Sequence, residues 1–244
     1  MRAVITGGTS GIGFSAAQEL GKTGYDIIIT GIDKSAAEQA VADLKKEGIH
    51  AEFIYADSML EGDVNHAFEE IAKKYPSIDV LVNNVGGLGG RQKFDGMETS
   101  FMRRVMALNF DSAFYASRAA IPLLKKGENA SIINYSTIAV TSGGGPGAGI
   151  YAAAKAAIEG LTRALAKELA EFGIRVNAVS PGTIDTAFHS ATARDVMETW
   201  KTGIAMKRFG DPSEVATVIE FLASSKASFL TGEIIQINGG QAFI

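Results

Sequence analysis

The feature that most restricts the fold lies at the start of the chain, where a short apolar run passes directly into a glycine-rich turn and a helix. The run is Arg2-Ala3-Val4-Ile5-Thr6, the turn follows at Gly7, and a helical pattern continues to Leu20. Glycines permit a tight turn that brings the backbone close to an anion, and a helix N-terminus presents free N–H groups to it. A plain strand-to-helix turn also uses glycine. The spacing of Gly11, Gly13 and Ala16, with a strand before and a helix after, nevertheless favours a dinucleotide site. The residues assigned to this phosphate cradle are Gly7, Thr9, Ser10, Gly11, Ile12 and Gly13.

Short apolar or β-branched runs recur along the whole chain and alternate with helical patterns. The segment from Ser35 to Lys46, rich in Ala, Glu and Lys, is one such helical pattern, and Gly48 is its stop signal. Strands that alternate with helices predict right-handed crossovers and a parallel sheet covered on both faces. We therefore expect an α/β fold of the Rossmann type, doubly wound, with residues 1–244 as a single domain. The expected strands after the first are 27–30, 51–55, 80–82, 131–134, 174–177 and 234–237.

Composition excludes several classes of function. The 244 residues carry 23 basic and 27 acidic side chains, a net charge of −4 that makes nucleic acid or an anionic membrane an unlikely partner. The chain has no cysteine and only three scattered histidines, so we expect no disulfide and no metal site. A strand that begins at Arg2 leaves no room for a secretory leader, and the expected location is cytoplasmic.

Tyr151 and Lys155 are the strongest candidates for acid–base chemistry. They lie four residues apart in an alanine-rich helical segment, which places both side chains on one face, one turn apart. A phenol with a pKa near 10 is a poor catalyst at neutral pH, and a neighbouring ammonium would favour the phenolate. Taken alone, the pair is more often a surface tyrosine and lysine on an alanine-rich helix.

Ordered motifs over nearly the whole length give the chain a family resemblance. They are Thr6-Gly7-x-x-x-Gly11-x-Gly13, Asn83-Asn84-Val85-Gly86, Asn109, Ser136-Thr137, Tyr151-x-x-x-Lys155, Asn177, Pro181-Gly182-Thr183-Ile184-Asp185-Thr186, Thr231-Gly232 and Asn238-Gly239-Gly240. In this order they resemble a classical short-chain dehydrogenase/reductase. The resemblance implies a sheet of about seven strands, a nicotinamide cofactor, a secondary alcohol or ketone as substrate, and a homotetramer or homodimer.

The resemblance also implies a role for each matching residue. Tyr151 would exchange a proton with the substrate oxygen. Lys155 would lower the pKa of that phenol and bind the nicotinamide ribose, and Asn109 would hold a water that extends the proton relay. Tyr151 and Lys155 thus count among the cofactor-binding residues as well. The remaining cofactor contacts would come from Asn83, Gly86, Pro181, Gly182, Ile184 and Thr186.

Two positions depart from the family pattern. Counted from Asn134, the position of the family's catalytic serine holds Thr137, and Ser136 lies one residue earlier. Threonine has the required hydroxyl, but its methyl group restricts χ1. We therefore take Thr137 as the catalytic hydroxyl and Ser136 as its rival. Val85 replaces the usual alanine, for which we expect only a packing adjustment.

The choice between NAD and NADP depends on the residues after the second strand. The family's usual acidic position falls on Gly31 and its usual arginine position on Ile32, whereas Asp33 comes just after them. A carboxylate there would accept hydrogen bonds from the adenosine ribose and repel a 2′-phosphate, although Lys34 would offset part of the repulsion. Asp33 could instead cap the following helix. Asp57, after the third strand, would face the adenine, or serve a turn or cap. The sequence favours NAD, with NADP as the alternative.

Substrate specificity should lie in residues 185–208, where Phe188, Met197, Trp200 and Met206 form an apolar face that could line a pocket or pack as an ordinary lid helix. Histidine 189 could touch the substrate or be a bystander. The identity of the alcohol or ketone is not encoded in any motif.

An oxidoreductase is the leading interpretation. A nucleotide-binding sensor of the same fold, without catalysis, is the alternative, although a sensor would need none of Tyr151, Lys155 and Asn109.

Overall fold

A seven-stranded parallel sheet forms the centre of the computed structural model, which describes residues 1–186 and 194–243. The strands are β1 (Arg2–Thr6), β2 (Asp26–Gly31), β3 (Ala51–Tyr55), β4 (Val80–Asn83), β5 (Ser131–Tyr135), β6 (Arg175–Pro181) and β7 (Ile234–Ile237). Their order across the sheet is β3-β2-β1-β4-β5-β6-β7, and every neighbouring pair is parallel. The expected strands are therefore confirmed, and so is the doubly wound fold class.

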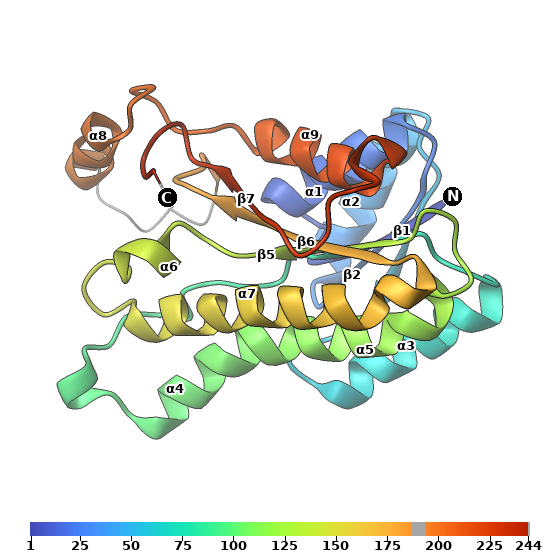
Figure 1. Ribbon diagram of the computed structural model, residues 1–244, viewed down its shortest axis with the longest axis horizontal. Helices are drawn as coiled ribbons and strands as arrows, with labels where there is room; N and C mark the ends of the chain where they lie inside the picture. Colours follow the sequence, from blue (N-terminus) through green and yellow to red (C-terminus); the bar gives the residue numbers. More distant parts are fainter. Residues whose placement is uncertain (187–193, 244) are drawn as a thin grey trace.

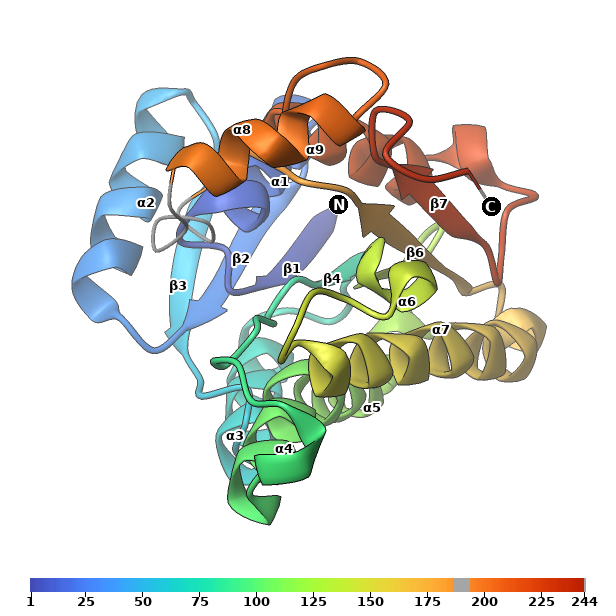
Figure 2. The same cartoon turned by 90° about the vertical axis from the view of Figure 1, so that its left-hand side faces the viewer.

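Helices cover both faces of this sheet, as Figures 1 and 2 show. The helices are α1 (Gly11–Lys22), α2 (Lys34–Lys46), α3 (Glu61–Lys74), α4 (Thr99–Met106), α5 (Ser112–Leu124), α6 (Ala139–Ser142), α7 (Gly149–Leu169), α8 (Arg194–Gly203) and α9 (Pro212–Ala223). Short 3-10 turns lie at Phe94–Gly96, Ala170–Phe172 and Ser225–Ala227, and a π-helical turn at Ala107–Asp111 joins α4 to α5. None of the helices within the described ranges is long and apolar enough to cross a membrane.

Two separate apolar cores result, one on each face. The core under α1 and α9 contains alternate residues of the central strands, such as Ile5 and Val82, whereas Val4 and Leu81 point into the core under α3 and α5. All four side chains are completely buried. Since successive side chains of a strand point to opposite faces, a strand covered on both sides must be apolar throughout. This requirement explains why the central strands β1, β2 and β4 appear in the sequence as nearly unbroken apolar runs.

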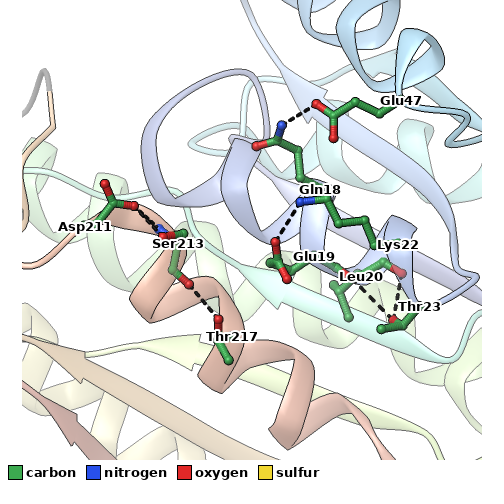
Figure 3. A network of polar contacts seen from close by, with 9 residues as sticks. All are labelled: Gln18, Glu19, Leu20, Lys22, Thr23, Glu47, Asp211, Ser213 and Thr217. Carbon is green, nitrogen blue, oxygen red and sulfur yellow. Dashed lines mark hydrogen bonds and ion pairs between the residues drawn. The ribbon is translucent and has the colours of Figure 1, made fainter.

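Figure 3 shows exposed polar contacts of α1 and α9. Gln18 of α1 donates to the Glu47 carboxylate just after α2, at 2.5 Å. At the start of α9, Asp211 accepts from the backbone N–H of Ser213 and forms a capping box with Glu214. These groups are exposed, so each contributes little to stability. Packing of apolar side chains holds this layer on the sheet.

The connections reverse direction between β1 and β4, which lie side by side although α1, β2, α2, β3 and α3 separate them in the chain. Helices therefore leave β1 and β4 for opposite faces and open a crevice at the carboxyl ends of these strands. Ligands of doubly wound sheets bind at such a switch point. Figure 1 shows α6, the first turn of α7 and α8 at one end of the molecule.

Candidate active site

Tyr151 lies in the first turn of α7 and is hydrogen-bonded to Thr137, which follows β5. The glycine-rich segment before α7 includes Gly143 and Gly144, both with positive φ, and turns the chain back toward the sheet. The helix start therefore faces the end of β5, and the two hydroxyl groups meet although 14 positions separate them in the sequence. The predicted acid–base residue and the predicted catalytic hydroxyl are thus adjacent.

Lys155 lies one turn further along α7, and its side chain is enclosed by protein. The residue is 4% exposed, and its Nζ donates to the carbonyl oxygen of Tyr135 at 2.9 Å. Burial lowers the pKa of this ammonium from 10.5 to about 8, because a charge is poorly solvated in the protein interior. An ammonium has three protons to donate, and one of them is directed at the Tyr135 carbonyl.

The pKa of Tyr151 shifts in the direction opposite to the expected one. Burial raises it above the usual 10, and the hydrogen bond with Thr137 lowers it only in part. The physical reason is that a phenolate loses solvation in this half-buried position, while the Lys155 ammonium is hydrogen-bonded to the Tyr135 carbonyl. The causes of this shift are burial and the Thr137 hydroxyl, so the expectation that Lys155 lowers the pKa of Tyr151 stays a prediction.

The two rival hydroxyls at the end of β5 have different partners. Ser136 donates its only hydroxyl proton to the Glu159 carboxylate, with 2.7 Å between Oγ and Oε1. Thr137 Oγ1 instead accepts from the backbone N–H of Ala139 at 3.3 Å, and its hydroxyl pairs with that of Tyr151, so its proton is directed into the site and not at a carboxylate. A ketone oxygen can only accept hydrogen bonds. Of the two hydroxyls, therefore, only that of Thr137 can donate to it in this arrangement.

Asn109 is fully buried in the π-helical turn between α4 and α5. Its Nδ2 donates to the carbonyl oxygens of Gly87 and Val105, and its Oδ1 accepts from the Gly87 N–H at 2.9 Å. A Cβ added at Gly86 would lie 2.8 Å from both Asn109 Oδ1 and Lys155 Nζ, so these two atoms flank a site that only glycine can occupy. No motif in the sequence indicated the π-helical turn, which is a common feature of functional sites.

The glycine-rich loop after β1 has the geometry of an anion cradle. Gly7 and Gly11 have φ angles of +65° and +54°, which other residues adopt only with strain. A Cβ at Gly13 would lie 2.5 Å from the Gly7 carbonyl oxygen, so glycine is required for the tight contact between loop and helix. The Ser10 side chain makes no capping bond at the start of α1. Backbone N–H groups of the first turn are thus directed at the crevice.

The segment after β6 forms the opposite wall of the crevice. A Cβ at Gly11 would lie 3.7 Å from Thr186 Cγ2, which brings residues 175 positions apart to the same place. Ile184 is buried in the core under α1 and α9 and forms an isolated parallel β-bridge with Gly210. The Gly182 N–H donates to the carbonyl oxygen of Ile237 in β7. Pro181 ends β6 and is buried. The predicted residues of this segment are therefore next to the cradle.

Comparison with known proteins agrees with this geometry. A family model described as Enoyl-(Acyl carrier protein) reductase matches residues 7–242. The 3-oxoacyl-[acyl-carrier-protein] reductase of Aquifex aeolicus is 35% identical over 238 residues, which cover 97% of this chain and 95% of the relative. A solved structure from Brucella melitensis, named as a short-chain dehydrogenase/reductase, covers 100% of this chain and 97% of its own, with 34% identity and a TM-score of 0.93. The chain is a classical short-chain dehydrogenase/reductase.

Further proteins are similar to this chain in structure or in sequence. An NADH-dependent reductase described as responsible for alginate metabolism is 33% identical, with a TM-score of 0.91, and covers 100% of this chain and 97% of its own. The 3-oxoacyl-[acyl-carrier-protein] reductase of Staphylococcus aureus strain N315 is 35% identical over 239 residues, 98% of this chain and 96% of the relative. Membership makes the chain an oxidoreductase that uses a nicotinamide cofactor.

The residues of this short-chain dehydrogenase/reductase fit such a cofactor. A Cβ at Gly13 would meet the Gly7 carbonyl oxygen and a Cβ at Gly86 would meet Lys155 Nζ, so only backbone lines the cradle at these two places. The Lys155 ammonium is buried beside Gly86 and has protons beyond the one given to Tyr135. The first turn of α1 would hold the pyrophosphate, and Lys155 would hold ribose hydroxyls.

Asn83, predicted to border the adenosine ribose, has its side chain turned away from the crevice. Its Nδ2 donates to Asn134 Oδ1 and Ser117 Oγ, both at 2.8 Å, in the buried layer under α5. Only its backbone remains to contact a cofactor. The neighbouring Asn84, which the sequence analysis assigned no role, contacts the cradle, and its Nδ2 donates to the carbonyl oxygens of Thr6 and Gly7. Because neighbouring side chains alternate at a strand end, the second asparagine faces the cradle and the first does not.

The acids after β2 and β3 serve the local backbone. Asp33 is the N-cap of α2, and its Oδ1 accepts from the Ala36 N–H at 3.0 Å. Asp57 Oδ1 accepts from the Met59 N–H at 2.9 Å in the turn before α3. The cap and turn interpretations thus describe both side chains, and each acid keeps a second carboxylate oxygen for another ligand.

The proposed substrate segment is described only in part. Residues 187–193 lie outside the described residues, and with them Phe188 and His189. Met206 is 60% exposed and lines a cavity with Thr183, Ile184 and Arg208, beside the end of β7. A groove between Gln92–Phe94 and the glycines of 143–149 lies at the start of α7. These two hollows flank the segments that carry Tyr151 and Ile184.

Proposed function

We propose that this enzyme interconverts a ketone and a secondary alcohol with NAD(H), using Tyr151 as the acid–base group. The pairing of Tyr151 with Thr137, above the buried Lys155, carries the proposal. Two hydroxyls from different elements converge there, and a ketone oxygen placed between them would receive two hydrogen bonds. Such donors, fixed in place before the reaction, stabilise the negative charge that develops on this oxygen.

The proposed reduction assigns a task to each residue of the site. A bound nicotinamide supplies the hydride that adds to the carbonyl carbon. Tyr151 donates its proton to the oxygen, and Thr137 holds that oxygen by a hydrogen bond. Lys155 would hold ribose hydroxyls, and its positive charge would favour the phenolate of Tyr151. Asn109 fixes the Gly86–Gly87 backbone beside Lys155. Its amide already has three protein partners, so we assign it this structural task ahead of the water relay expected from the resemblance.

A preference for NAD(H) over NADP(H) is part of the proposal. The free oxygen of Asp33 would accept from the adenosine ribose and repel a 2′-phosphate. Lys34 is the neighbouring cation, and its Nζ lies 5.7 Å from the centroid of the Tyr55 ring. The cradle itself carries Ser10 rather than a basic residue. An NADH-dependent reductase is also among the similar solved structures.

The first experiment is a calorimetric titration with NADH and NADPH, followed by ketone reduction assays. A 3-oxoacyl thioester is the first ketone to test, given the names of the relatives. We expect tighter NADH binding, loss of turnover with intact NADH binding in Tyr151→Phe, and a large fall in kcat in Thr137→Val. Tighter NADPH binding would refute the cofactor preference. Full turnover by Tyr151→Phe would refute the acid–base assignment.

The enzyme is further proposed to act as a homotetramer or homodimer. The molar mass in solution, measured by light scattering, tests this assembly: a multiple of the 25.6 kDa chain is expected, and a mass of one chain would refute it.

A further inference from the structure

Three consecutive residues at the end of β5 are each bonded to a different turn of α7. Asn134 Nδ2 donates to Thr162 Oγ1 at 2.9 Å, the Tyr135 carbonyl accepts from Lys155 Nζ at 2.9 Å, and Ser136 Oγ donates to Glu159 Oε1 at 2.7 Å. β5 leads directly to Thr137, and α7 begins beside Tyr151. These three bonds therefore set the position of one hydroxyl of the site relative to the other.

The bond between Ser136 and Glu159 differs from the other two. Lys155 belongs to the site itself, and Thr162 and Asn134 are completely buried between β5 and α7. Ser136 is 3% exposed and adjoins Thr137, whereas the Glu159 side chain is 17% exposed. Glu159 lies eight residues after Tyr151 and four after Lys155, which places all three on one face of α7. The second oxygen of Glu159 lies 3.9 Å from Arg163 Nη2.

We infer that Glu159 is a positioning residue, which holds Thr137 in place for the reaction through its hydrogen bond with Ser136. The inference rests on the proposed function of Thr137 and Tyr151. A carboxylate accepts a stronger hydrogen bond than a neutral group, and it commits the Ser136 proton to Glu159. Ser136 consequently has no proton to offer the substrate oxygen, and the loop after β5 keeps Thr137 directed at Tyr151.

The exposure of Thr137 makes such a support necessary. Its side chain has the long bond from the Ala139 N–H, at 3.3 Å, and the pairing with Tyr151, while its carbonyl accepts from the Val140 N–H at 3.0 Å. After Thr137, the Ile138 N–H donates to the Pro181 carbonyl oxygen, and the chain continues through the four-residue helix α6 and the segment of glycines with positive φ before α7. The last rigid point before Thr137 is therefore Ser136, whose backbone N–H pairs with β6 and whose side chain pairs with α7.

A double-mutant cycle in the full-length enzyme tests this role. Ser136→Ala and Glu159→Leu should each lower kcat about ten- to a hundredfold, the range for a small misplacement of reacting groups, with little change in NADH affinity. The double variant should lose no more than either single variant, because both remove one interaction. Glu159→Gln retains an acceptor and should recover most of the activity. Glu168→Leu, an exposed acid on the same helix, is the matched control and should behave as the parent.

The outcomes separate this inference from the proposed function. Losses that multiply in the double variant, or single variants with unchanged kcat, would overturn the role of Glu159. A fall in thermal stability alone, with kcat intact after correction for folded protein, would overturn it as well. Tyr151→Phe and Thr137→Val are assayed in parallel. If these two retain activity the proposed function itself fails, whereas if they lose it and the Glu159 variants do not, only the positioning role is refuted.

Discussion

Replacement of Lys155 by methionine should abolish activity and yet stabilise the fold at neutral pH. The ammonium is 4% exposed, and burial lowers its pKa from 10.5 to about 8. The difference of about 2.5 pKa units corresponds to roughly 3 kcal/mol of unfavourable free energy in the folded state. Methionine has an unbranched side chain of similar length without the charge. Its cost is the hydrogen bond to the Tyr135 carbonyl, about 1 kcal/mol, which leaves a net gain of about 2 kcal/mol at pH 7.

The gain should depend on pH in a defined direction. Below pH 8 Lys155 is protonated in both states, so the full penalty is present. Between pH 8 and 10.5 the unfolded chain binds the proton and the folded protein releases it, so the stability of the parent rises with pH. At pH 10 most of the penalty has gone, and the parent and Lys155→Met should be about equally stable.

Urea denaturation of both proteins at pH 7 and pH 10 measures this difference, and groups common to both cancel. Lys167→Met, on an exposed position of α7, is the matched control and should show no pH-dependent difference from the parent. The reasoning is refuted if Lys155→Met is less stable than the parent at pH 7, or if its gain is the same at both pH values. Turnover and NADH binding, measured on the same samples, should both be lost or strongly weakened.

Three further substitutions test other parts of the structure. Tyr135→Phe removes a buried hydroxyl that has no hydrogen-bond partner among the described residues, so it should raise the free energy of unfolding by about 1 kcal/mol in urea; a loss would indicate a hidden partner. Gly13→Ala places a Cβ 2.5 Å from the Gly7 carbonyl oxygen and Asn84 Nδ2, and should cost about 2 kcal/mol and weaken NADH binding; an unchanged melting temperature and affinity would contradict the close contact. Asp33→Ala should cost about 1 kcal/mol through the lost cap and reduce the preference for NADH over NADPH in calorimetry; an unchanged preference would leave Asp33 as a cap only.

Local patterns in the sequence were sufficient for the fold and for most of the candidate site. Short apolar or β-branched runs indicated the strands, and all seven are present within the described residues. The strand, glycine loop and helix at the start of the chain indicated the cradle, since positive φ and close approach both require glycine. The i, i+4 spacing of Tyr151 and Lys155 fixed their common helix face. Such features depend on neighbours in the chain and can be recognised without knowledge of the remainder.

Partners that are distant in the chain could not be assigned in this way. The choice between Ser136 and Thr137 depends on where each hydroxyl proton is directed, and Glu159, 23 positions away, determines that for Ser136. Likewise Asn83 and Asn84 are chemically identical, and only the packing of the α5 layer against β4 turns the first away from the crevice. The sequence alone determined the kind of site and its place at the carboxyl edge of the sheet. The tertiary structure decided which of two equivalent side chains faces that site, because hydrogen-bond direction and burial depend on groups that only folding brings together.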